Sequence, residues 1–104
     1  HTISEIDVAE VHDAFSVCEP MALESLGFVN PGKGMSMIND LHETNNFKIN
    51  PRGGLIGTGH PLGATGISQT IEIVEKRQTD NAKVGLIHNM SAAATSSTVL
   101  VLEK

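Results

Sequence analysis

The chain has 104 residues, of which 39% are hydrophobic and 3% aromatic, and its formal net charge is −5 at pH 7. This length suits a single domain, whose core must be built from aliphatic side chains. An acidic chain with no basic run and few aromatics lacks the usual means of binding nucleic acid, and no apolar run reaches membrane-spanning length. The single cysteine, Cys18, excludes an internal disulfide and a cysteine-rich zinc site, and we expect a cytoplasmic protein.

The first half of the chain predicts a strand followed by two helices. Residues 6–14 alternate in the manner of a buried strand. The next segment, 15–28, predicts a helix in which Pro20 lies in the first turn or causes a kink. The apolar positions of this helix are Val17, Met21, Leu23 and Leu26. Composition then predicts a turn at 29–34, a short helix over 35–43 and an extended or looped segment over 44–54.

The second half begins with the strongest helix prediction, over residues 61–78. Pro61 suits the first helical position, and Ile67, Ile71 and Val74 repeat at helical spacing. Two strands follow, over 83–90 and 97–104, and these could pair as an antiparallel hairpin around a turn of small residues at 91–97. This order predicts an α/β domain with helices packed on a mixed sheet. So few strands leave open edges, which indicates a missing N-terminal portion or a partner, and we expect an incomplete domain over residues 1–104 that lacks its first strand and helix.

The stretch GGLIGTGHPLGATG, residues 53–66, holds six of the ten glycines. We expect His60 to cap the helix that follows, where the positive end of the helix dipole disfavours imidazolium. A neutral imidazole can donate to an oxyanion or take a proton from a nucleophile. The glycines that would let a carbonyl or thioester approach are Gly53, Gly54, Gly59 and Gly63. A glycine-rich turn with a surface histidine is an alternative, whereas a phosphate loop would need a Gly-Lys-Ser/Thr ending.

Further polar residues stand where the predicted strands end. His12 and Asp13 follow the first strand, and His88 and Asn89 lie near the end of a later one. Because ligands of α/β folds bind at strand ends, His12, His60 and His88 could converge on one site. Each could equally be a structural residue, and no His-x-x-x-His pair supports a metal site, so we expect no bound metal.

Three segments resemble the thiolase family. NPRGGLIGTGHPLGATG, residues 50–66, resembles the Asn-x-x-Gly-Gly…Gly-His-Pro-x-Gly-x-(Ser/Thr)-Gly signature of that family. EVHDAF, residues 10–15, resembles the His-Asp-Cys-Phe element of the sterol-carrier-protein-type thiolases and their archaeal relatives. GLIHNMSAAATSSTVLVLEK, residues 85–104, resembles their last hairpin. The resemblance runs in family order over nearly the whole chain and suggests most of a thiolase-like C-terminal half.

This resemblance implies a fold, a chemistry and partners. Thiolases have two similar halves, each a five-stranded mixed sheet covered by helices, and they assemble as dimers or tetramers. They condense or cleave acyl-CoA thioesters through an acyl-cysteine intermediate whose cysteine lies in the N-terminal half. The implied substrate is a coenzyme A thioester, with no covalently bound cofactor. The implied partners are an N-terminal thiolase half and further copies of the protein.

The resemblance also implies roles for residues. His60 would activate the nucleophilic cysteine and donate to the thioester oxyanion. His12 stands where many thiolases use Asn to hold an oxyanion-hole water. Gly53 and Gly54 would line the thioester channel. His88 and Asn89 stand where other thiolases carry their Cys-x-Gly element.

One position departs from the family pattern. Ala14 replaces the cysteine that acts as acid/base at the α-carbon in the His-Asp-Cys-Phe element. His88 is the better candidate to replace it, and Cys18 the weaker one. The function is therefore an acyl-CoA acyltransferase domain, a thiolase-like enzyme without Claisen activity such as a retro-aldolase, or a non-catalytic acyl-CoA-binding scaffold. We expect the isolated chain to be inactive, because it lacks a matching nucleophile.

Overall fold

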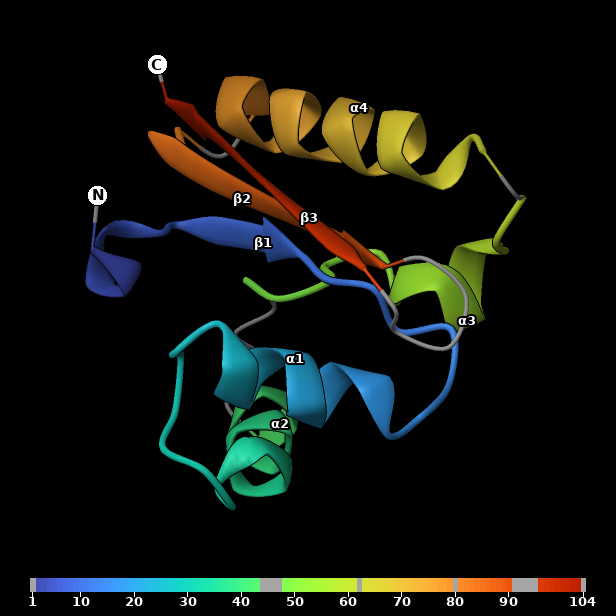
Figure 1. The fold of residues 1–104 in the computed structure, drawn as a ribbon. Helices are drawn as coiled ribbons and strands as arrows, with labels where there is room; N and C mark the ends of the chain where they lie inside the picture. Colours follow the sequence, from blue (N-terminus) through green and yellow to red (C-terminus); the bar gives the residue numbers. More distant parts are fainter. Residues whose placement is uncertain (1, 44–47, 62, 80, 91–95, 104) are drawn as a thin grey trace.

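A three-stranded mixed sheet carries helices on both faces (Figure 1). The computed structural model describes residues 2–43, 48–61, 63–79, 81–90 and 96–103. In chain order the elements are η1 Ile3–Glu5, β1 Val8–Glu10, α1 Cys18–Ser25, α2 Gly34–Glu43, α3 Gly54–Thr58, α4 Thr65–Thr79, β2 Val84–Met90 and β3 Ser97–Glu103. The predicted α/β class with a mixed sheet is confirmed.

The sheet has the strand order β1-β2-β3. Strand β1 runs parallel to β2, with Val8 opposite Gly85, and β2 pairs antiparallel with β3. The predicted C-terminal hairpin is therefore confirmed, although residues 91–95 of its expected turn lie outside the described residues. Asp7 fixes the start of the parallel pair, because its carboxylate accepts from the backbone N–H groups of Lys83 and Val84 at 2.8 and 3.0 Å. These two bonds lower the pKa of Asp7.

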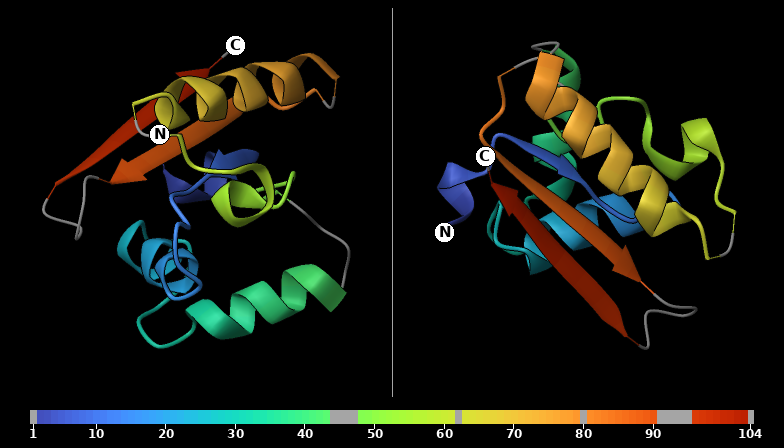
Figure 2. Two further views of the ribbon diagram at one scale, coloured as in Figure 1. Left: turned by 90° about the vertical axis from the view of Figure 1, so that its right-hand side faces the viewer. Right: turned by 90° about the horizontal axis from the view of Figure 1, so that it is seen from above.

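Two small cores lie on opposite faces of the sheet. On one face, β1 and β2 pack against α1 and α2; the buried residues there are Ile6, Ala9, Val11, Ala22, Leu23, Ile49, Val84 and Leu86. On the other face α4 covers β1 and β2 through Val8, Ile73, Ala82 and Ile87. Strand β3 extends beyond α4 at the edge of the sheet (Figure 2).

The first strand is shorter than expected, and the first helix buries a different face. Strand β1 spans three residues instead of the predicted nine, because its ladder with β2 ends at the pair of Glu10 and Ile87, after which His12 meets β2 through the side chains of His88 and Asn89. Pro20 lies in the first turn of α1, where its missing N–H costs nothing. Leu23 is fully buried, but Val17 and Met21 are each 58% exposed, so the predicted apolar face is only partly the core face.

Helix α4 differs from its prediction in its start and its orientation. It begins at Thr65, so Pro61 is not its first residue. The predicted stripe of Ile67, Ile71 and Val74 is 66%, 54% and 38% exposed. The buried stripe consists of Thr65, Gln69 and Ile73. Both stripes repeat at helical spacing, so periodicity alone could not show which one faces the sheet.

Candidate active site

The site begins where β1 and β2 end side by side. His12 follows β1, and Asn89 is the penultimate residue of β2. Their side chains join through His12 Nδ1 and Asn89 Oδ1, which are 2.9 Å apart. Because an amide oxygen only accepts, Nδ1 of His12 carries the proton, and a neutral ring leaves Nε2 as an acceptor. The sheet thus fixes both the orientation and the tautomer of His12.

His60 meets this ring from the loop after α3. The two imidazoles lie edge to face, with ring centroids 4.9 Å apart and an interplanar angle of 88°. His60 Nδ1 is 2.6 Å from the hydroxyl of Thr65, and that hydroxyl donates to the carbonyl of Pro61 at 3.2 Å. Thr65 must therefore accept from Nδ1–H, so that in the neutral tautomer Nε2 of His60 is the acceptor.

The expected helix cap at His60 is wrong. Helix α4 begins at Thr65, five residues after His60, with a turn in which the Ala64 N–H donates to the Pro61 carbonyl at 3.1 Å. The helix dipole acts within the first turn, so it does not explain the state of this ring. The hydroxyl of Thr65, which sequence analysis did not single out, orients His60 instead.

His88 takes a different place from the other two histidines. Successive side chains of a strand point to opposite faces, so His88 lies on the face of Val84 and Leu86, opposite to Asn89. It is buried, and its Nδ1 accepts weakly from the backbone N–H of His12 at 3.5 Å. Burial, and then the neighbouring His12, lower the pKa of His88. The structure therefore groups the side chains of His12, His60 and Asn89, while His88 supports the backbone behind them.

Asp13 and Gly54 join β1 to α3. The buried Asp13 carboxylate accepts from the backbone N–H of Leu55 at 2.6 Å. A Cβ on Gly54 would collide with that carboxylate, and Gly54 has a φ of +64°. Burial raises the pKa of Asp13, opposed by its backbone hydrogen bonds. Glycine is therefore required at position 54 because the Asp13 carboxylate occupies the space of a side chain. This reason differs from the one expected from the sequence, which was to leave room for a thioester.

The remaining glycines shape the loop around His60. Gly53 precedes α3 with a φ of +91°. Gly59 and Gly63 have φ values of +93° and +81°, and a methyl group at either would meet no atom within 4 Å. The surroundings of these last two glycines are open, as a site that admits a ligand requires.

Asn50 is a site-building residue that sequence analysis missed. Its side-chain oxygen accepts from the N–H of Val11 at 2.8 Å, and its own N–H donates to the carbonyl of Ala9 at 2.9 Å. Asn50 has a φ of +45°, which asparagine tolerates better than most residues. These bonds hold the glycine loop against β1 just before His12. The asparagine of the motif was visible in the sequence, but its partner 39 residues away was not.

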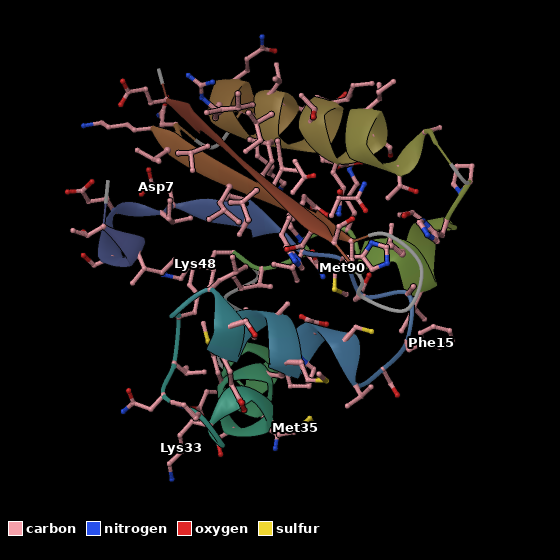
Figure 3. All side chains as sticks on the ribbon, viewed as in Figure 1. Asp7, Phe15, Lys33, Met35, Lys48 and Met90 are labelled. Atoms are coloured by element: carbon pink, nitrogen blue, oxygen red, sulfur yellow. The ribbon has the colours of Figure 1, made fainter. Side chains whose placement is uncertain are left out.

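A cavity of about 360 Å³ opens beside Asn89. Its lining residues are Gly66, Thr70, Ile87, Asn89, Met90, Ser96, Thr98 and Leu100. The lining combines apolar side chains with hydroxyl groups. The volume of the cavity falls in the range of small-ligand sites. Figure 3 shows Met90 at the end of β2 on this part of the molecule.

Ala14 occupies the position at which the His-Asp-Cys-Phe element carries its cysteine. Ala14 is half-buried between Asp13 and Phe15, and Phe15 is 72% exposed and points outward (Figure 3). Cys18 begins α1, on the opposite face of the sheet from α4.

Among the residues that the structure describes, no group of three or more His, Cys, Asp and Glu side chains is arranged to hold a metal ion. Within the same residues, no helix combines the length and the apolar character needed to cross a membrane.

Fold and site together define an α/β protein in which two histidines pack edge to face beyond the carboxyl ends of the parallel strands β1 and β2. The thiolase C-terminal domain-like family matches residues 1–104, and the chain belongs to that family. The suspected resemblance is confirmed.

Named relatives agree with this assignment. The chain is 38% identical over 112 residues to an acetyl-CoA acetyltransferase of Methanothermobacter thermautotrophicus, covering 99% of this chain and 29% of that protein. It is 42% identical to sterol carrier protein 2 of Oryctolagus cuniculus, covering 93% of this chain and 19% of that protein. It is 35% identical to benzoylsuccinyl-CoA thiolase subunit BbsB of Thauera aromatica, covering 69% and 19%. The chain thus spans less than a third of these relatives.

Proposed function

We propose that this chain is the C-terminal domain of a thiolase-like acyl-CoA acyltransferase, and that the nucleophilic cysteine lies in an N-terminal half. The observation that carries the proposal is the placement of the His60 ring, whose Nδ1 contacts the Thr65 hydroxyl and which packs edge to face against His12. Membership of the thiolase family and the similarity to an acetyl-CoA acetyltransferase support the same chemistry. The free cysteine suits a reducing compartment, so we place the protein in the cytoplasm.

In the proposed acylation step, Nε2 of His60 takes the proton of the cysteine thiol. The thiolate then attacks the thioester carbonyl, forming the new C–S bond and an oxyanion. Nε2 of His12 accepts one hydrogen of a water molecule, whose other hydrogen is donated to that oxyanion. Collapse of the intermediate breaks the bond to coenzyme A, whose sulfur recovers the proton from His60.

The open space around the site supports a thioester substrate. Gly59 and Gly63 leave the approach to His60 clear. The cavity lined by Asn89 is the candidate location for the acyl group, because the side chain of Asn89 is also bonded to the His12 ring.

Two exposed apolar surfaces support the proposed partners. The outer stripe of α4, Ile67, Ile71 and Val74, has no cover among the described residues, and β3 exposes Val99, Leu100 and Val101. We assign the outer stripe of α4 to the N-terminal half. We assign the edge strand β3 to a contact between copies in a homo-oligomer, since an open edge invites pairing.

Ala14 favours a second candidate function. A methyl group carries no proton, so acylation of the cysteine can proceed while proton transfer at the α-carbon lacks its usual group. His88 is the candidate replacement, although its burial on the opposite face of the sheet does not favour that role. The alternative is a thiolase-like enzyme acting on CoA thioesters without a Claisen step, such as a retro-aldolase. A non-catalytic acyl-CoA-binding scaffold is the third reading.

The test is cleavage of acetoacetyl-CoA by the longer protein that carries this chain. His60→Ala should lower kcat/KM by about 100-fold or more, the usual contribution of a general base. Full activity of His60→Ala would refute the proposed role. If the wild type acylates its cysteine but does not cleave acetoacetyl-CoA, the non-Claisen alternative holds, and Ala14→Cys should then increase cleavage. Binding of acyl-CoA without acylation would support the scaffold.

A further inference from the structure

A small cavity lies between β1, α3 and α4. Its volume is about 10 Å³, and the residues that bear on its chemistry are Glu10, Arg52, Thr58, Ser68, Gln69 and Glu72. A volume of about 10–15 Å³ is what one water molecule requires. The cavity is therefore the size of a single solvent molecule and too small for an organic ligand.

Apart from Oε2 of Glu72, which lies 2.7 Å from Nε of Arg52, two buried acceptors of the lining residues have no hydrogen-bond partner among the described residues. These are Oε1 of Glu10 and Oε1 of Gln69, whose side chains belong to residues that are 5% and 3% exposed. The amide nitrogen of Gln69 donates to the carbonyl of His88 at 3.4 Å, which fixes the orientation of the amide. Buried acceptors left unpaired are costly, so each of these oxygens needs a hydrogen-bond donor.

The charges that face Glu10 are mostly negative. The pKa of Glu10 is raised to about 8, chiefly by burial. The negative charges of Glu72 on α4, Asp13 after β1 and Glu19 on α1 also raise this pKa, whereas the positive charge of Arg52 lowers it. Arg52 is already paired with Glu72 at 2.7 Å and with Glu75 at 2.5 Å. Glu10 is therefore mainly a neutral carboxylic acid at pH 7.

We propose that the cavity holds one water molecule that bridges Glu10 on β1 and Gln69 on α4 and thereby fixes β1 against α4. The water donates one hydrogen to each unpaired oxygen, and the hydroxyl-bearing residues Thr58 and Ser68 line the same cavity. This assignment satisfies both acceptors without placing a charge between the strand and the helix.

The location of the bridge makes Glu10 a positioning residue for the site. Glu10 precedes His12 by two residues on the same face of β1, α3 leads directly to His60, and Gln69 holds the carbonyl of His88. Three segments that carry the site thus meet at one water molecule. The water site does not depend on the proposed acyltransferase function. Only the effect of the water site on turnover rests on that function.

The first experiment follows thermal unfolding of the longer protein between pH 5 and 9.5. A raised pKa in the folded state contributes stability that is present at low pH and is lost as the pH rises from about 4.5 to about 8. Glu10→Gln mimics the neutral acid and keeps the oxygen acceptor. Its Tm should exceed that of the wild type by an amount that grows with pH and becomes constant above about pH 8. Glu75→Gln, half-exposed and outside this cavity, is the matched control and should follow the wild type.

The second experiment identifies the occupant in a high-resolution crystal structure of the same protein. A water peak within hydrogen-bond distance of both oxygens is expected. A Tm that changes when sodium is replaced by potassium or by a large organic cation would instead indicate a metal cation and overturn the water assignment. An empty cavity, or a Glu10→Gln variant with the pH dependence of the wild type, would also overturn the proposal.

The effect on the site is measured separately by turnover. Glu10→Gln should keep wild-type kcat, whereas Glu10→Leu, which fills the space but removes the acceptor, should lower kcat about tenfold with little change in KM. Equal kcat values for the two variants would show that the bridge does not position the histidines. If the wild type shows no turnover, the proposed function fails while the unfolding and diffraction results still decide the water site.

Discussion

At the residue scale, the contact between Asp13 and Gly54 determines where the glycine loop can lie. The carboxylate of Asp13 occupies the space that any side chain at Gly54 would need, and it accepts the N–H of Leu55 at 2.6 Å. Because Asp13 adjoins His12 in the chain, and α3 is followed within two residues by His60, this contact sets the distance between the two histidines. Asp13 can thus influence the neighbouring His12 entirely through the backbone that it holds.

The hydrogen bond to Leu55 predicts a difference between two substitutions of Asp13. Asp13→Asn retains an oxygen acceptor, whereas Asp13→Ala leaves a buried N–H without a partner, at a cost of about 1–3 kcal/mol. Burial raises the pKa of Asp13, so the wild-type side chain loses stability as the pH rises above its ordinary value of 3.8, and the neutral amide avoids this loss. Urea unfolding at pH 7 should therefore rank Asp13→Asn near the wild type and Asp13→Ala well below it. Equal losses in the two variants would show that the hydrogen bond is not what matters.

At the scale of elements, helix α4 has two apolar stripes and buries one of them. Ile73 is fully buried and packs onto Gly85 of β2, where an added Cβ would collide with it. Ile71 lies two residues away on the same helix and is 54% exposed. The helix therefore contacts the sheet through one apolar stripe and exposes the other.

This arrangement predicts opposite results for two neighbouring isoleucines. Ile73→Ala should reduce the free energy of unfolding by about 2–5 kcal/mol, since it empties a packed site. In the isolated chain, Ile71→Ala should change it by about 0.5 kcal/mol or less, as exposed positions do. Chemical denaturation of the two variants measures both values. A larger loss for Ile71→Ala than for Ile73→Ala would mean that α4 faces the sheet with the other stripe.

The elements also show what sequence patterns could and could not predict. The hairpin of β2 and β3 was predictable because alternation and pairing there are local in the chain. The start of α4 was not predictable. Pro61 is typical of a first helical residue, but the chain makes one further turn before the helix begins at Thr65. Helix α3 was missed because two of its five residues are glycines, which disfavour helix in isolation. The grouping of His12 with Asn89 followed from their positions at strand ends, but the partners of Asn50 and Glu10 depend on tertiary packing that no local pattern encodes.

At the scale of the whole molecule, the described residues form a site that is open on one side. The histidine pair, its oxygen and hydroxyl supports and the cavity beside Asn89 are all present. The outer stripe of α4 and the exposed valines and leucine of β3 are apolar surfaces of a kind that proteins usually bury against a partner. The chain spans less than a third of the relatives it matches, so a larger assembly can cover these surfaces.

The last prediction is that the 104-residue chain, purified alone, catalyses no CoA-dependent thiolysis of acetoacetyl-CoA. Its one cysteine, Cys18, begins α1 on the face of the sheet opposite to α4, so no thiol of the chain is placed to serve His60. The longer protein, assayed under the same conditions, is the positive control. Ile67→Ser with Ile71→Ser should make the isolated chain less prone to aggregate, yet should lower the Tm of the longer protein, because the same surface is exposed in one and covered in the other. Turnover by the isolated chain that disappears in Cys18→Ser would contradict the assignment of the nucleophile to another part of the protein, and an unchanged Tm in the longer protein would show that α4 is not covered there.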